Sequence, residues 1–263
     1  MINAGLINAG MRATYAVAMS FPPSAAPLDD VQRVLCVFAH PDDVDFGCSA
    51  TVARWVAEGL DVSYLLVTRG DAGGFDDTPR DQMPVLRESE QRAAAAAVGV
   101  KNVEFLDGYS DGKVTPSLEL RKEITAAIRR YRPDRVLTSS PLRRWERISG
   151  PSHPDHLAVG EATTCAVYPD SRNEFALPEL LAGGLEPWAV REVWYSGGPN
   201  PDHGVDVTDF FDRKIAALRA HVSQTSHRGD FEGFVRGWMT KTAESTGLPE
   251  GRLAEAYTII RTE

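Results

Sequence analysis

Two short histidine motifs hold most of the metal-ligand and acid-base chemistry of this 263-residue chain. The first reads HPDD over 40–43 and the second reads HPDH over 153–156. Imidazole nitrogens and carboxylate oxygens suit borderline divalent ions such as Zn²⁺, which in catalytic sites take three protein ligands and keep a fourth position for water. His40 and Asp43 lie three residues apart on a segment that can curl round one ion, and His156 is the natural third ligand.

Two side chains of the same motifs are left for proton transfer. Asp42 stands beside the first two ligands and His153 stands beside the third. A metal-assisted hydrolase needs a base that takes a proton from water and an acid that gives one to the leaving group. The residue types and their spacing therefore point to metal-assisted hydrolysis.

Two structural interpretations compete with this one. A single His-Pro-Asp sequence is commonly only a turn, in which proline fixes φ and aspartate caps the next helix. Two such motifs in one chain, each after a strand pattern and before a helix pattern, favour a shared site instead. A structural zinc usually has four closed ligands that include cysteines. Because neither motif contains cysteine, an open site is favoured.

The segments before the motifs explain how the motifs are brought together. A β-branched apolar run covers 34–39 and another covers 135–140, as in buried parallel strands. Open α/β sheets bind their ligands outside the carboxyl ends of such strands. We therefore expect both motifs at one crevice.

The rest of the chain alternates helix and strand patterns, which predicts an α/β domain with a Rossmann-like, mostly parallel sheet and helices on both faces. We expect residues 1–30 to form an arm and 31–263 to form a single domain. The expected helices cover 46–58, 84–98, 117–131, a segment from about 156, 209–222 and 231–245. The expected strands cover 62–68, 103–106, 135–139, 192–195 and 256–260, with a loop over 169–187 and His203 in a loop.

The two motifs, a glycine-rich loop over 69–74 and a late AHVSQ segment over 220–224 together resemble the LmbE-like (PIG-L) zinc-dependent de-N-acetylases. The resemblance runs from about residue 33 to the C-terminus. The glycine-rich loop lacks the G-x-G-x-x-G spacing of a dinucleotide site and is either a rim of the crevice or a plain surface loop.

The resemblance implies a role for each residue of the motifs. The residues matching His40, Asp43 and His156 hold zinc, and Asp42 matches the general base. His153 matches an acid or oxyanion stabiliser, and Asp155 matches the residue that orients this histidine. Two departures from the family, Asp45 in place of glutamate and Ser49-Ala50-Thr51 in place of Gly-Gly-Thr, touch no proposed ligand but affect packing around the crevice.

Three further residues are weaker candidates for substrate binding. Arg87 matches the family's Arg-x-x-Glu pattern and is expected either to bind substrate hydroxyls or to form a solvated ion pair on a Glu-rich helix. Asp111 is expected either to reach a sugar hydroxyl or to serve an Asp-Gly turn. His221 matches a family histidine, although interaction with a helix C-terminus also explains a histidine there.

The activity that the resemblance implies is removal of an N-acyl group, most often acetyl, from an amino sugar such as N-acetylglucosamine or from a related small conjugate. One zinc ion per chain is expected, although other divalent metals fit the same ligands. Two alternatives remain open, a metal-dependent phosphoesterase with two ions about 4 Å apart and a noncatalytic sugar-binding relative.

The net charge and the residue composition indicate which classes of binding partner and which location are expected. The formal charge of −9 argues against nucleic acid and against an anionic membrane surface. Apolar runs fall short of the roughly twenty residues of a membrane span, and the N-terminal segment lacks the pattern of a signal peptide. Three cysteines without a Cys-x-x-Cys pair suit a reducing cytoplasm. A homo-oligomer is left open.

Overall fold

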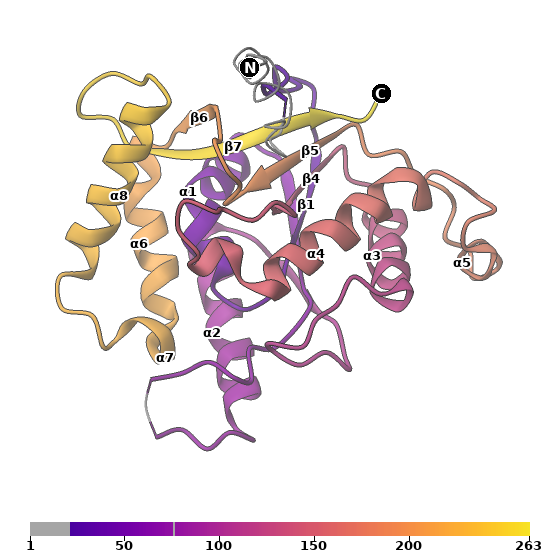
Figure 1. Ribbon diagram of the computed structural model, residues 1–263, viewed down its shortest axis with the longest axis horizontal. Coiled ribbons are helices and arrows are strands. Elements are labelled where there is room, and N and C mark those ends of the chain that lie inside the picture. The colour runs from indigo at the N-terminus through magenta and orange to yellow at the C-terminus, as the bar shows by residue number, and fades with distance from the viewer. Residues whose placement is uncertain (1–21, 76) are drawn as a thin grey trace, which may run out of the picture.

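The computed structural model of the protein describes residues 22–75 and 77–263, which form one α/β unit around a twisted sheet (Figure 1). Within these residues the sheet has seven strands in the order β3-β2-β1-β4-β5-β7-β6. The strands are β1 (Arg33–Phe38), β2 (Asp61–Leu66), β3 (Asn102–Phe105), β4 (Arg135–Ser139), β5 (Glu192–Ser196), β6 (His203–Asp206) and β7 (Ala254–Arg261). Strands β1 to β5 are parallel, whereas β7 runs antiparallel to both β5 and β6.

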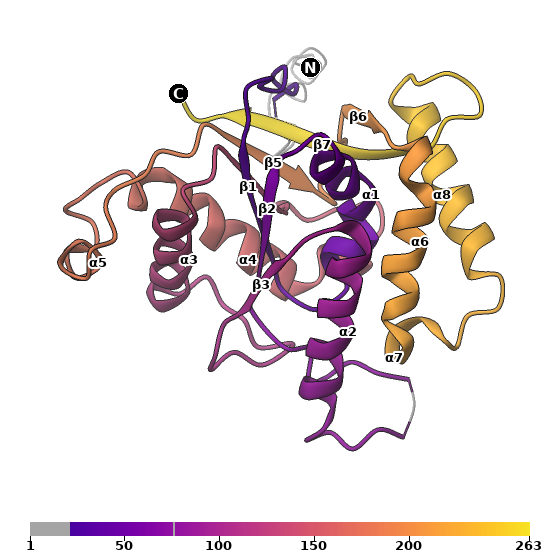
Figure 2. The same ribbon diagram turned by 180° about the vertical axis from the view of Figure 1, so that it is seen from behind.

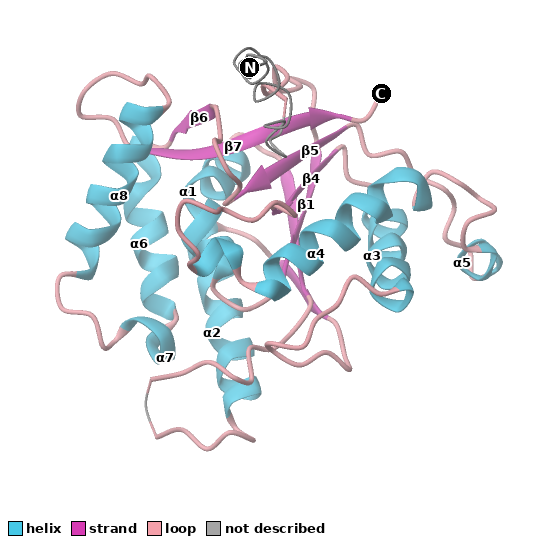
Figure 3. Cartoon of the chain, in the orientation of Figure 1, coloured by secondary structure: helices cyan, strands magenta, loops and turns pink. Residues whose placement is uncertain are grey.

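Helices cover both faces of this sheet, as the two opposite views show (Figures 1 and 2). The helices are α1 (Asp43–Ala57), α2 (Met83–Val98), α3 (Leu118–Tyr131), α4 (Pro154–Cys165), α5 (Pro178–Ala182), α6 (Phe211–Ala220), α7 (Val222–Thr225) and α8 (Phe231–Ser245). Short 3₁₀ turns at Gly150–Ser152 and Thr208–Phe210 and a kinked segment at Ala166–Asp170, where Tyr168 is extended, connect some of them. Helices α1, α2, α6 and α8 lie on one face, and α3 and α4 on the other (Figure 3).

The side chains of β1 point alternately into two separate hydrophobic cores, one on each face of the sheet. Val34 and Cys36 pack into the core beneath α1, α2 and α6. Leu35 and Val37 pack into the opposite core beneath α3 and α4. Full burial of an aliphatic side chain contributes about 1.5–3 kcal/mol. Both faces of the strand are therefore apolar, which is why its sequence reads as a continuous run rather than as an alternation.

The order of the strands reverses between β1 and β4, and this reversal determines where the site lies. The chain moves outward from β1 through β2 to β3, and then returns to place β4 on the other side of β1, with Val37 paired to Thr138. The connections after β1 and β4 therefore leave to opposite faces and open a crevice between them. Both histidine motifs lie in these two connections.

The predicted fold class is confirmed, with differences at the edges. Strand β6, which contains His203, was expected to be a loop, and α5 lies inside the expected loop over 169–187. Both predictions were wrong because the two elements have only four and five residues, too few for a periodic pattern to be recognised. Helix α1 begins at Asp43, three residues earlier than expected, so the first motif is partly helical.

The proposed N-terminal arm falls largely outside the described residues. The part that is described lies along β7, where the Ala25 N–H donates to the Ile259 carbonyl at 2.9 Å and the Ile259 N–H donates to Ser24 Oγ at 2.9 Å. Among the described residues, no helix combines the length and the apolar character that crossing a bilayer requires.

The contact of α4 with the end of β4 generates a first prediction. A Cβ at Gly160 would lie 2.4 Å from the Ser139 carbonyl oxygen and 2.8 Å from the Pro141 nitrogen. We expect Gly160→Ala to lower the free energy of unfolding by about 1–3 kcal/mol, because the backbone of β4 cannot yield without moving α4. Urea denaturation measures this change.

Gly237 provides the matched control, because it is a helical glycine of α8 with no atom near its missing Cβ. Gly237→Ala should raise the stability by about 0.5–1 kcal/mol through helix propensity. Equal effects of the two substitutions would contradict the close approach at Gly160.

Candidate active site

Three potential ligand atoms from the two motifs converge on one point. His40 Nδ1 lies 3.3 Å from Asp43 Oδ2 and 3.2 Å from His156 Nε2, and His156 Nε2 lies 3.0 Å from Asp43 Oδ1. Ligands bound at 2.0–2.2 Å in a tetrahedral arrangement lie about 3.3–3.6 Å apart. The donor set and its spacing therefore fit one zinc-sized ion.

The two connections place these atoms by simple local geometry. His40 follows β1 by two residues, and Asp43 is the first residue of α1. The His40 N–H donates to Asp43 Oδ2 at 2.8 Å, which closes the curl that the three-residue spacing predicts. His156 lies in the first turn of α4, which starts with Pro154, a residue suited to that position.

The second ring nitrogen of His40 is held by carboxylates. His40 Nε2 lies 3.0 Å from Asp155 Oδ2 and 3.0 Å from Asp111 Oδ1. The Asp155 carboxylate is itself fixed by the N–H groups of Gly112 at 2.7 Å and Val114 at 3.2 Å. Histidines that bind metals usually donate their other N–H to such a carboxylate, which leaves the first nitrogen for the ion.

Other groupings of ligand atoms share His40. The nitrogens of His40, His153 and His156 lie within 4.8 Å of one another, as do ligand atoms of His40, Asp111 and Asp155. The set with Asp111 and Asp155 uses Nε2 of His40, at 3.0 Å from each carboxylate, whereas the set with Asp43 uses Nδ1, with separations of 3.0–3.3 Å. Because Nε2 is already held by two carboxylates, Nδ1 with Asp43 and His156 is the favoured ligand set.

The charges around His40 favour a cation. Burial alone would lower the pKa of His40, but Asp43, Asp111 and Asp155 outweigh it and raise the pKa to about 12. Burial likewise opposes ionisation of Asp43, yet the positive charges of His156 and His40 hold its pKa well below the ordinary value. A positive charge at this point is therefore strongly stabilised.

Asp42 lies beside this cluster of ligand atoms and contacts Arg87. Its φ of 88° places a non-glycine residue in the left-handed region, which separates its side chain from that of its neighbour Asp43. Its Oδ2 accepts from the Arg87 guanidinium at 3.2 Å. Burial raises the pKa of Asp42 to about 6, with Arg87 acting in the opposite direction. The carboxylate is thus an acceptor near neutral pH.

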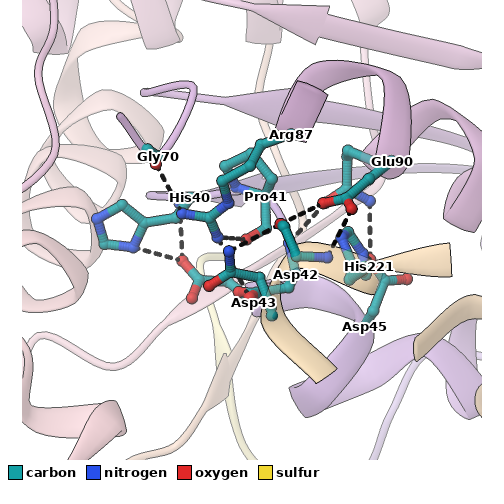
Figure 4. A network of polar contacts seen from close by, with 12 residues as sticks. His40, Pro41, Asp42, Asp43, Asp45, Gly70, Arg87, Glu90 and His221 are labelled. Carbon is teal, nitrogen blue, oxygen red and sulfur yellow. Dashed lines mark hydrogen bonds and ion pairs between the residues drawn. The ribbon is translucent and has the colours of Figure 1, made fainter. Parts of the chain in front are cut away.

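Arg87 is buried, with 3% of its surface exposed, so the alternative of a solvated ion pair is wrong. Its guanidinium donates to the carbonyls of Gly70 at 2.9 Å and Pro41 at 2.5 Å (Figure 4). A Cβ at Gly70 or Gly73 would lie 2.0 or 2.4 Å from Arg87 Nη1. The glycine-rich loop therefore lies against Arg87 at the site, and the φ of 64° at Gly70 further favours glycine there.

His153 lies beside the ligands, and its ring centre is 5.1 Å from that of His40. Its Nδ1 accepts from the Asp155 N–H at 3.3 Å, which places the proton of the neutral ring on Nε2. Burial and the charges of His40 and His156 lower the pKa of His153. The Asp155 carboxylate was expected to orient His153, but it contacts His40 instead, and Asp155 fixes His153 through its main chain.

The remaining candidates are divided between the site and the interior. Asp111 lies beside His40 and is 11% exposed, so it stays open to the crevice. His221 is fully buried, and its Nε2 lies 2.8 Å from Asp45 Oδ2. This contact, rather than the end of a helix, holds the ring, and burial removes it from direct reach of a substrate.

Three buried polar residues near the site were not identified from the sequence. Gln91 accepts from the Asp42 N–H at 2.8 Å, and Lys214 donates to the Asp45 and Phe46 carbonyls while pairing with Glu255 at 2.7 Å. A signal for Gln91 exists. It lies four residues after Arg87 on the buried face of α2, where a polar side chain needs a partner.

Known proteins with similar sequences are deacetylases. A family model described as PIG-L, GlcNAc-PI de-N-acetylase, matches residues 35–167. The chain is 34% identical over 203 residues to diacetylchitobiose deacetylase of Thermococcus kodakarensis, covering 75% of this chain and 72% of that protein. It is 33% identical over 190 residues to 1D-myo-inositol 2-acetamido-2-deoxy-alpha-D-glucopyranoside deacetylase of Rhodococcus erythropolis, covering 63% of this chain and 60% of that protein.

A solved structure shares the architecture as well. N,N'-diacetylchitobiose deacetylase of Pyrococcus horikoshii superposes with a TM-score of 0.79 at 29% identity, covering 88% of this chain and 85% of that one. The likeness extends well beyond the region that the family model matches.

The contact between Arg87 and Asp42 generates a second prediction. In the metal-free protein, Arg87→Met should raise the pKa of Asp42 well above 6, because the guanidinium no longer favours the carboxylate against burial. Carbon-13 NMR titration of the Asp42 carboxyl measures this pKa, and circular dichroism checks that the variant is folded. An unchanged or lower pKa would contradict the assigned role of Arg87.

Proposed function

The chain belongs to the PIG-L family of GlcNAc-PI de-N-acetylases and is a hydrolase of amide bonds, and on this premise we propose that it removes the acetyl group from an N-acetylglucosamine-type sugar with the help of one zinc ion. The observation that carries the proposal is the convergence of His40 Nδ1, Asp43 and His156 Nε2 within 3.0–3.3 Å of one another. A neighbouring carboxylate, Asp42, is left over for proton transfer.

His40, Asp43 and His156 would hold the zinc ion. When bound, zinc would lower the pKa of water to about 7 and polarise the amide carbonyl of the substrate. The ligands contribute one negative charge from Asp43 and leave the ion with a net positive charge. That charge complements the oxygen of an amide that becomes negative during the reaction.

Asp42 is the base in this proposal. A base works best when its pKa lies near the working pH, and burial brings the pKa of Asp42 to about 6. The contact of its Oδ2 with Arg87 fixes the direction of the carboxylate. At pH 7 the carboxylate is mostly ionised and ready to accept a proton from water.

His153 stabilises the oxyanion or gives a proton to the departing amine. The Asp155 N–H at its Nδ1 leaves Nε2–H as the donor of the neutral ring. Because burial and the charges of His40 and His156 lower the pKa of His153, hydrogen-bond donation to the oxyanion is favoured over full proton transfer.

The phosphoesterase alternative requires two ions about 4 Å apart. The second group of ligand atoms is His40, Asp111 and Asp155, and it uses the other nitrogen of the same imidazole. Two ions would force that ring to lose both protons, which disfavours a two-ion site. We therefore propose one ion per chain and a small N-acylated sugar or conjugate as the substrate.

The location and partners follow from weaker observations. Cys36 and Cys48 are free and buried, which suits the reducing cytoplasm that we propose. The charge of −9 disfavours nucleic acid and anionic membranes as partners. All residues of the proposed site belong to one chain, so the proposed function is the same for a monomer and for a homo-oligomer.

A panel of N-acetylated amino sugars tests the function. The wild type loaded with zinc should release acetate from N-acetylglucosamine or diacetylchitobiose, and p-nitrophenyl phosphate should remain intact. His156→Ala should lose the ion at neutral pH, as plasma emission spectrometry measures, and should lose the activity with it. Full metal content in this variant would remove His156 from the ligand set.

Asp42→Asn separates metal binding from proton transfer. This variant should keep one zinc per chain while its kcat falls by roughly 10² to 10⁴, the usual contribution of a general base. Metal analysis and steady-state kinetics on the same sample measure both quantities. If the variant lost its zinc, Asp42 would be a ligand and the base would have to be another group.

A further inference from the structure

Gln91 links Asp42 to a buried pair that lies farther from the crevice. Its side-chain oxygen accepts from the Asp42 N–H at 2.8 Å, and its Nε2 donates to Asp45 Oδ2 at 2.8 Å. The same Asp45 oxygen lies 2.8 Å from His221 Nε2. Figure 4 shows Asp42 between His40 on one side and the Asp45–His221 pair on the other. Gln91, Asp45 and His221 are all fully buried.

Asp42 needs this support because its backbone is strained. A φ of 88° is uncommon for a residue with a side chain and persists only where the surroundings impose it. The Asp42 carbonyl accepts from the N–H groups of Asp45 and Phe46 at 2.9 and 2.8 Å, as the first turn of α1 requires. The Asp42 N–H points the other way, out of the helix, and Gln91 supplies its acceptor.

Asp45 and His221 decide which way the Gln91 amide faces. An ionised carboxylate only accepts hydrogen bonds, so the NH₂ group of Gln91 must face Asp45. The carbonyl oxygen of the amide then faces the Asp42 N–H. Donation thus runs from Asp42 to Gln91 and from Gln91 to Asp45, and His221 donates to the same carboxylate from the opposite side.

We propose that Gln91, with its amide orientation set by Asp45 and His221, is the positioning residue that holds Asp42 in its left-handed conformation and so aims its carboxylate for proton transfer. This inference rests on the proposed role of Asp42 as the base. Gln91 touches neither the ligands His40, Asp43 and His156 nor the substrate position, so its loss should act on kcat and spare zinc binding.

Removal of both hydrogen bonds is the simplest test. Gln91→Met should lower kcat by roughly 10- to 100-fold, the usual effect of residues that support a site from behind. KM should change by less than about twofold, and the zinc content should stay at one per chain. Thr51→Val is the matched control, because it removes the buried hydrogen bond that the Tyr257 hydroxyl donates to Thr51 Oγ1 in α1, and it should leave kcat unchanged.

Reversal of the hydrogen-bond polarity is the sharper test. Gln91→Glu alone sets two carboxylates against each other and should resemble Gln91→Met, whereas Asp45→Asn alone can turn its amide oxygen toward Gln91 and His221 and should keep most of the wild-type kcat. In the double variant, the new amide in α1 can donate to both the new carboxylate in α2 and the neutral His221 ring, while that carboxylate still accepts from the Asp42 N–H. The net charge is preserved, and kcat should recover at least tenfold over Gln91→Glu alone.

A readout on the metal-free protein makes the test independent of catalysis. The Asp42 amide proton should exchange with solvent faster in Gln91→Met than in the wild type and should regain protection in the double variant. Failure of the wild type to deacetylate any sugar would overturn the proposed function, while the exchange rates would still test the inference. Kinetic effects no larger than those of Thr51→Val, or a double variant whose defects simply add, would overturn the inference.

Discussion

The two nitrogens of His40 have different partners, and the rest of the site depends on this division. Nε2 faces the carboxylates of Asp155 and Asp111, which leaves Nδ1 toward Asp43 and His156. The main-chain N–H groups that hold Asp155 come from the loop after β3, so a third connection fixes the ring. A carboxylate behind the ring makes Nδ1 a stronger ligand and sets its direction.

The fold serves this arrangement through close approaches of its backbone. Gly160 lets α4 lie against the end of β4. Gly70 and Gly73 let the glycine-rich loop after β2 lie against Arg87. Arg87 then ties that loop to the segment between β1 and α1 through the Pro41 carbonyl. The neighbouring aspartates 42 and 43 can therefore serve different purposes, because the backbone turns one toward Arg87 and the other toward the histidines.

Much of this could be predicted from the sequence, because motifs and long periodic elements are local features. The two histidine motifs, the strands before them and the parallel sheet follow from patterns of ten or so residues. The contacts of Asp155, Gln91 and Lys214 could not, since they join segments far apart in the chain. The expectation that the Asp155 carboxylate orients His153 differed from the structure for this reason. His153, two residues before Asp155, accepts a hydrogen bond from the Asp155 main-chain N–H. The Asp155 carboxylate contacts His40 instead, which is 115 residues away in the chain.

The position of the metal tests the central claim most directly. Crystals of the protein grown with zinc, measured on both sides of the zinc absorption edge, should give one anomalous peak per chain within bonding distance of His40 Nδ1, Asp43 and His156 Nε2. His40 Nε2 should remain on the Asp155 carboxylate. A peak bonded to His40 Nε2 between Asp111 and Asp155, or one held by His153 without Asp43, would contradict the account.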